Sequence, residues 1–92
     1  MQLFLNFNGK LLPANAFFIS PDNRSFRYGE GLFETIRVQN GEIPLWDYHW
    51  NRILSSLPQL YFEVPLHFTE SVLKQEIAAL VQKNRCTEAA RI

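Results

Sequence analysis

The 92-residue sequence predicts an α+β domain in which two helices pack on an antiparallel sheet. Two Asn-Gly pairs, Asn8-Gly9 and Asn40-Gly41, each follow a short apolar segment, and this pair favours a tight turn between antiparallel strands. Two later segments, over residues 46–57 and 70–83, repeat apolar residues at the spacing of amphipathic helices. The length suits a single domain.

The two Asn-Gly pairs define the strands that we expect. The first pair should join a strand over residues 2–7 to a return strand from Lys10 to Leu12. Residues 20–23, Ser-Pro-Asp-Asn, have the composition of a turn. The second pair should join a strand from Leu32 to Gln39 to a return strand from Glu42 to Trp46.

The helices have recognisable ends. Asp47 is expected to cap the first helix and Pro58 to end it, whereas Thr69 should precede the second helix and Asn84 should end it. The residues expected to face inward are Trp46, Trp50, Ile53, Leu54, Leu57, Val72, Leu73, Ile77, Leu80 and Val81. Residues 88–92 have the composition of the beginning of a further strand.

Composition and charge argue against several classes of protein. Nine basic and nine acidic residues cancel without a basic stripe, so we expect no nucleic-acid partner. No apolar run approaches a membrane span, and the single Cys86 favours a reducing, cytoplasmic compartment. His49 and His67 lack the ligand spacing of a metal site. Aromatic residues are abundant, at 14%, which indicates a heavy core or a surface that packs against another chain.

The first segment that carries chemistry is Tyr28–Val38, with the sequence Tyr-Gly-Glu-Gly-Leu-Phe-Glu-Thr-Ile-Arg-Val. Its two glycines lead into a strand, and taken alone they indicate an ordinary turn. Glu34 falls on the apolar face of that strand, where a carboxylate must find a partner, and a structural ion pair is the favoured interpretation. The other face carries Phe33, Thr35 and Arg37, and taken alone Arg37 is interpreted as a solvated strand residue.

The second such segment is the first helix. His49 and Arg52 are three residues apart and therefore lie on the same side, and Ser56 continues this line beside the apolar face. A fixed guanidinium there can bind a phosphate through two parallel hydrogen bonds. For an isolated arginine, a solvated helix face is the simpler interpretation, and an isolated histidine is more often packed than catalytic.

Taken together, these segments are similar to the N-terminal signature of the class IV aminotransferases. The similarity joins the glycine segment, the second Asn-Gly turn, Leu45 and His49-x-x-Arg52 with Ser56 after it, and it covers most of residues 1–60. The family includes branched-chain aminotransferases, D-amino acid transaminases and aminodeoxychorismate lyases. The resemblance implies pyridoxal 5′-phosphate as cofactor, an amino acid and a keto acid as substrates, and a homodimer with its site near the subunit interface.

The resemblance also implies roles for individual residues. Arg52 would bind the phosphate of the cofactor. Tyr28, Phe33 and Arg37 stand at positions that line or approach the substrate pocket. Glu34 matches a glutamate of the family's strand, and His49 would support the geometry of Arg52.

Two departures from the family pattern are relevant. Glu30 stands where the family usually has an aspartate. The family's lysine that forms the Schiff base lies beyond residue 92, and Lys10, Lys74 and Lys83 have no matching context. We therefore expect residues 1–92 to be the N-terminal small domain of a longer protein, a fragment that is inactive alone and contains no catalytic residue.

The reaction type stays open at this level. Phe33-Glu34-Thr35 is closer to lyase-like members, whereas glycine after Phe-Glu is typical of branched-chain aminotransferases. An alternative function is a stand-alone, non-catalytic module that binds a protein partner through its glycine segment and aromatic residues. The joint spacing of the glycine segment and His49-x-x-Arg52 argues against that alternative.

Overall fold

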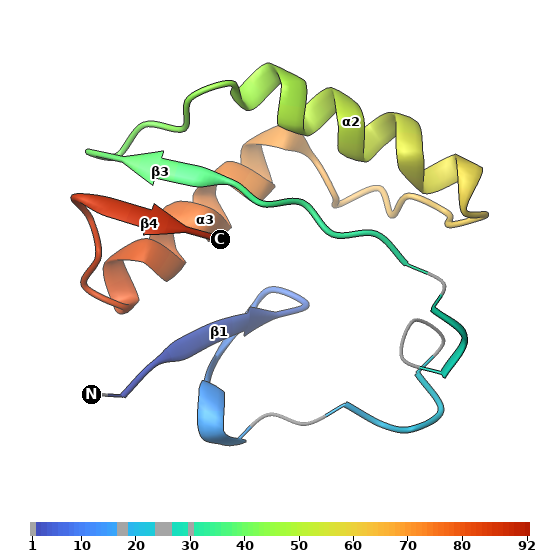
Figure 1. Ribbon diagram of the computed structural model, residues 1–92, viewed down its shortest axis with the longest axis horizontal. Coiled ribbons are helices and arrows are strands. Elements are labelled where there is room, and N and C mark those ends of the chain that lie inside the picture. Colours follow the sequence, from blue (N-terminus) through green and yellow to red (C-terminus); the bar gives the residue numbers. More distant parts are fainter. Residues whose placement is uncertain (1, 17–18, 24–26, 30) are drawn as a thin grey trace.

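The computed structural model describes residues 2–16, 19–23, 27–29 and 31–92, so Glu30 lies outside the described residues. Figure 1 shows the arrangement. The elements, in chain order, are β1 (Phe4–Phe7), β2 (Lys10–Pro13), the short 3₁₀ helix η1 (Ala14–Ala16), β3 (Arg37–Gln39), α2 (Trp46–Gln59), α3 (Glu70–Lys83) and β4 (Ala89–Arg91). The predicted α+β class is confirmed. Among these described residues, no helix has the length and apolar character required to cross a membrane.

The first hairpin forms as the sequence predicts. β1 and β2 pair antiparallel, from Phe4 opposite Pro13 to Phe7 opposite Lys10. The turn places Asn8 at φ 52° and Gly9 at φ 88°, which are the positive angles that this turn requires. The Asn6 side chain adds support, because its Oδ1 accepts a hydrogen bond from the Gly9 amide at 2.9 Å.

The second predicted strand pair is only partly correct. Asn40 and Gly41 make the expected turn, with φ angles of 52° and 81°. Gln39 and Glu42 then exchange two backbone hydrogen bonds of 2.8 and 3.0 Å. Pairing ends there because Leu45 takes a left-handed conformation at φ 61° and α2 begins at the next residue. The predicted return strand over residues 42–46 is therefore wrong.

The partner of β3 is instead β4, at the far end of the chain. Their antiparallel register sets Val38 opposite Ala90 and Arg37 opposite Arg91. Ile36 and Ile92 continue the contact through two backbone hydrogen bonds of 2.7 and 2.8 Å. The described residues thus form two separate two-stranded sheets, and the strand expected from Leu32 is regular only over Arg37–Gln39.

The ends of the helices match three of the four predictions closely. Thr69 caps α3 by accepting a hydrogen bond from the Val72 amide at 3.2 Å, and Asn84 follows the last turn. Pro58 lies one residue before the end of α2 rather than after it. Asp47 is not the cap but an acidic residue of the first turn, where it still faces the positive end of the helix dipole.

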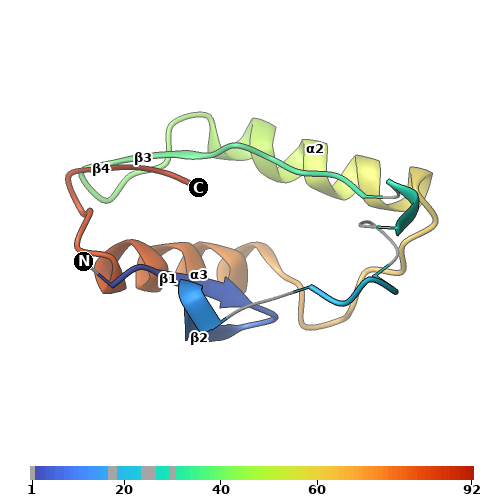
Figure 2. The ribbon, with the colours of Figure 1, turned by 60° about the horizontal axis from the view of Figure 1, so that its bottom comes forward.

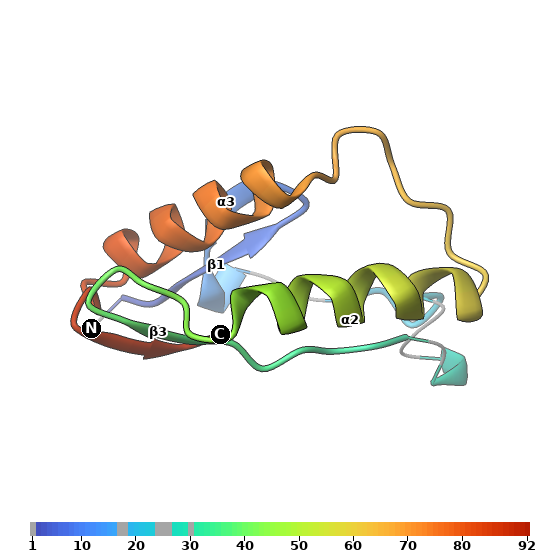
Figure 3. The same ribbon diagram turned by 90° about the horizontal axis from the view of Figure 1, so that it is seen from above.

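The core lies between two layers. Figures 2 and 3 show α2 with β3 and β4 in one layer and α3 with the β1–β2 hairpin in the other, and the two helices run in opposite directions. The buried cluster between them consists of Ile36, Val38, Trp46, Ile77 and Val81. Ile53 is also buried, as predicted, but Val72, expected to face inward, is 37% exposed and does not belong to this cluster.

Asn84 fastens the first hairpin to α3. Its Oδ1 accepts from the Phe4 amide at 2.8 Å, and its Nδ2 donates to the Phe4 carbonyl at 2.9 Å and to the Leu80 carbonyl at 3.1 Å. We expect Asn84→Ala to lower the free energy of unfolding by about 1–3 kcal/mol in urea denaturation, because these half-buried backbone groups lose their partner. The matched control is Asn51→Ala on the exposed side of α2. Equal midpoints for both variants would contradict this role.

Candidate functional site

In the extended segment that leads to β3, exposed and buried side chains alternate from Phe33 onward, as the sequence predicts. Ile36 and Val38 are buried, whereas Phe33 is 90% exposed and Arg37 is also exposed. The side chain of Glu34 lies on the inner face and is only 12% exposed. The strand therefore turns one carboxylate toward α2 and presents its aromatic and cationic residues to the solvent.

Glu34 meets both polar residues of the predicted helix stripe. Its Oε1 lies 3.0 Å from Nδ1 of His49, and its Oε2 accepts from Nε of Arg52 at 2.9 Å. Nη2 of Arg52 also bonds Oε1, so the pair is bidentate. Because a carboxylate only accepts, Nδ1 of His49 carries a proton. The ion pair favoured for Glu34 from the sequence is thus present, and it joins three residues that we singled out separately.

The ion pair between Glu34 and Arg52 shifts the pKa of each partner. The hydrogen bond from Arg52 is the main reason that the pKa of Glu34 lies below its ordinary value, and the bond from His49 adds to this effect against the opposing effect of burial. In turn, the hydrogen bond to Glu34 raises the pKa of the Arg52 guanidinium. Both residues therefore stay charged at neutral pH.

This shift predicts how acid acts on the domain. Between the lowered pKa of Glu34 and its ordinary value near 4.5, the unfolded chain binds more protons, so stability falls as the pH falls. We expect the wild type to be more stable than Glu34→Gln by a constant amount above the ordinary pKa of 4.5. Below this pH the difference in unfolding free energy should become smaller. Urea titrations across this range measure it. A difference that does not change with pH would count against the ion pair.

Arg52 keeps one edge of its guanidinium toward the solvent. Its side chain is 61% exposed, and Nη1 bonds no residue within the described part of the chain. Arg52 lines a pocket together with Leu32, Phe33, Glu34, Thr35 and Ser56, and the charge of Glu34 is already paired with Arg52. A cation with free donors and two hydroxyl groups make a donor set that suits a phosphate. The residues present therefore fit an anionic phosphate group.

The other predicted site residues lie apart from this pocket. Tyr28 is 63% exposed, and the guanidinium of Arg27 lies 5.2 Å from the centre of its ring. Arg37 lies on β3, directly opposite Arg91 of β4. Sequence reasoning missed Arg91, because no spacing rule indicated that the last residues of the chain pair with β3.

Like charges at opposed positions of two strands destabilise the pair unless a counter-ion is near. The two exposed arginines thus form a second cationic position on the outer face of the β3–β4 sheet.

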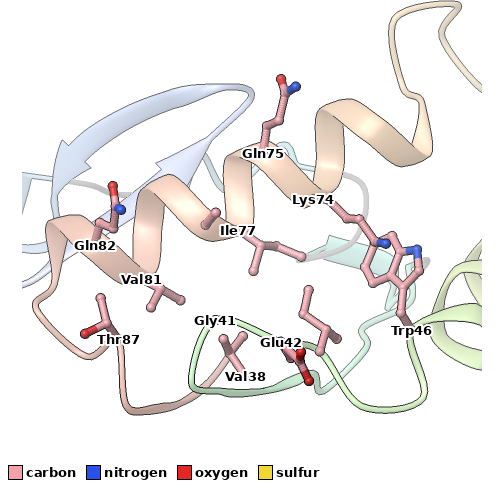
Figure 4. A pocket seen from close by; sticks show the side chains of 12 residues that line it. Val38, Gly41, Glu42, Trp46, Lys74, Gln75, Ile77, Val81, Gln82 and Thr87 are labelled. Carbon is pink, nitrogen blue, oxygen red and sulfur yellow. The ribbon is translucent and has the colours of Figure 1, made fainter.

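A further pocket lies between α3 and the turn after β3. Figure 4 shows Ile77 and Val81 pointing into it toward Val38, with Gln75 and Gln82 pointing away. At its end, Nζ of Lys74 lies 5.1 Å from the ring centre of Trp46. The lining is mainly the outer side of the core and includes none of the predicted site residues. We therefore assign the candidate site to the Arg52 pocket, where one cationic donor lies beside the hydroxyl-bearing residues Thr35 and Ser56.

Fold and site define a small α+β domain in which a carboxylate holds one arginine beside a pocket. The family model for amino-transferase class IV matches residues 31–92. The chain therefore belongs to the class IV aminotransferase family.

Two curated relatives are similar over most of this chain. It is 30% identical over 79 residues to a D-alanine aminotransferase of Bacillus licheniformis, and these residues make up 86% of this chain and 27% of that protein. It is 23% identical over 77 residues to a D-alanine aminotransferase of Listeria innocua serovar 6a, and these residues make up 84% of this chain and 26% of that protein. The chain thus spans about a quarter of the length of these relatives.

Proposed function

We propose that these residues form the N-terminal small domain of a pyridoxal-phosphate-dependent aminotransferase that acts on amino acids. The observation that carries this proposal is the bidentate hold of Glu34 on Arg52, in a chain of the class IV family. The relatives are about four times as long as the matched segment, so the Schiff-base lysine would come from outside residues 1–92. By itself the chain would be inactive.

Arg52 would hold the phosphate of the cofactor through its solvent-facing edge, and the hydroxyl groups of Thr35 and Ser56 line the same pocket. When bound, pyridoxal phosphate supplies an electron sink that stabilises negative charge at the α carbon of an amino acid. Residues of this chain would fix the phosphate end and so set the position of the ring. His49 and Glu34 would support Arg52 from behind.

Phe33 and Arg37 on the outer face of the strand, together with Tyr28 before it, would contribute to the substrate pocket. Arg37 and Arg91 lie opposite each other, and the carboxylate of an amino acid would relieve their repulsion. The names of the two relatives favour D-alanine as the first substrate to examine.

A second subunit would complete the site. Several large apolar side chains are exposed, among them Phe33, Tyr48, Tyr61 and Leu66. Exposed apolar residues of this kind support a surface that packs against another chain. We therefore propose a homodimer. The free Cys86 supports a cytoplasmic location, since thiols stay reduced there.

A turnover assay tests the proposal. The natural protein that contains residues 1–92 is supplied with pyridoxal phosphate and D-alanine, and pyruvate is measured with and without 2-oxoglutarate as amino acceptor. Transamination predicts pyruvate only when the acceptor is present. Pyruvate from aminodeoxychorismate without any acceptor would instead indicate a lyase. Failure of both reactions over a panel of D- and L-amino acids would favour a non-catalytic binding module.

A further inference from the structure

We propose that Glu34 is a positioning residue, which orients the guanidinium of Arg52 so that its Nη1 edge faces the pocket, and that His49 in turn fixes Glu34. The inference rests on the proposed function, in which Arg52 binds the phosphate of the cofactor. It adds a role for Glu34, a residue of the same pocket that would act through Arg52.

The geometry shows how the orientation is set. An arginine that is 61% exposed has several free torsions and does not hold one direction by packing. Two hydrogen bonds to Glu34, donated by Nε and Nη2, define the plane of the guanidinium. Bonding on that edge leaves Nη1 directed away from the Glu34 carboxylate, and Nη1 bonds no residue in the described part of the chain.

Glu34 can do this because it is itself fixed. Its side chain and that of His49 are each only 12% exposed, and Oε1 lies 3.0 Å from Nδ1 of His49. The backbone next to Glu34 is anchored at Ile36, which is buried and hydrogen-bonded to Ile92. The strand and α2 thus fix the position of Glu34, and Glu34 fixes the orientation of the Arg52 guanidinium.

Two effects of this carboxylate on phosphate binding have opposite signs. Its negative charge repels a phosphate, but this repulsion is reduced because the same carboxylate is already paired with the guanidinium of Arg52. Its hold on Arg52 preserves a fixed, charge-assisted geometry, the loss of which costs about ten-fold. Positioning therefore outweighs repulsion, and neutralising Glu34 should weaken phosphate binding.

Binding of pyridoxine 5′-phosphate to the 92-residue chain tests this sign. This probe has the ring and phosphate of the cofactor but no aldehyde that reacts with lysine. By NMR titration we expect Glu34→Gln to bind about ten-fold more weakly than the wild type. Tighter or equal binding would overturn the inference. In the Arg52→Ala background, Glu34→Gln should cause no further loss of affinity, and an additive loss would also overturn the inference.

The wild type provides a readout that does not depend on the variants' folding. The Nε–H resonance of Arg52 should be protected from exchange by Glu34 and should stay protected when the probe is added. Loss of that protection on binding would show that phosphate displaces Glu34, which contradicts the inference. Equal binding by the wild type and Arg52→Ala would contradict the proposed function instead. Weak binding by Arg52→Ala with full binding by Glu34→Gln would contradict only the positioning role.

Discussion

Replacing Arg52 by alanine is expected to weaken the binding of pyridoxine 5′-phosphate by about ten- to a hundred-fold. Hydrogen bonds from a charged donor to a phosphate contribute about 1.5–3 kcal/mol, and each 1.4 kcal/mol corresponds to a factor of ten. The solvent-facing edge of Arg52 is the cationic donor of its pocket. In the natural protein, loss of this anchor should lower the affinity for pyridoxal phosphate by a similar factor.

Two further variants make this result specific. Arg52→Lys keeps the charge but loses the planar fork that Glu34 holds, so its affinity should lie between those of the wild type and Arg52→Ala. Arg85→Ala removes an exposed arginine beyond the end of α3 and should bind as the wild type does. An affinity that falls equally in Arg85→Ala and Arg52→Ala would show that only net charge matters, and the site would then be wrong.

Replacing Ile77 by alanine is expected to have the largest effect on stability. Ile77 is 5% exposed and belongs to the buried cluster that joins α3 to β3 and α2. Truncating a buried isoleucine to alanine costs about 2–5 kcal/mol. A domain of this size is held by roughly 5–14 kcal/mol in total, so the variant should lose much of its stability. Urea denaturation followed by circular dichroism measures the loss.

The control for this variant lies two residues away on the same helix. Gln75 is exposed and points away from the core in Figure 4, so Gln75→Ala should change stability by no more than about 0.5 kcal/mol. If Ile77→Ala and Gln75→Ala unfold at the same urea concentration, the two layers are not held together by this cluster.

Local signals in the sequence predicted the turns and the second helix well. Asn8-Gly9 and Asn40-Gly41 adopt the positive φ angles that their turns need, and Thr69 caps α3. These features depend on neighbouring residues alone. The pairing of β3 with β4 depends on residues some fifty positions apart, and no local pattern encodes that choice. The left-handed Leu45, which ends the expected return strand, has no signal in its residue type.

The site, too, combines features that local patterns predicted with features that depend on distant residues. Alternation along the strand placed Glu34 on the inner face, and helical spacing placed His49 and Arg52 on one side of α2. The bond between the two segments follows from how strand and helix pack, which the sequence alone did not specify. Asn84 was predicted only as a helix end, yet its side chain also holds β1, because the two segments meet in space.

The absorbance spectrum of the natural protein that contains these residues tests the assigned chemistry most directly. After addition of pyridoxal phosphate we expect a band between roughly 330 and 430 nm that changes when D-alanine is added, as the amino group moves to the cofactor. The change should be reversed by a keto acid. A spectrum without this band, or a band that neither D-alanine nor any other amino acid alters, would contradict an aminotransferase.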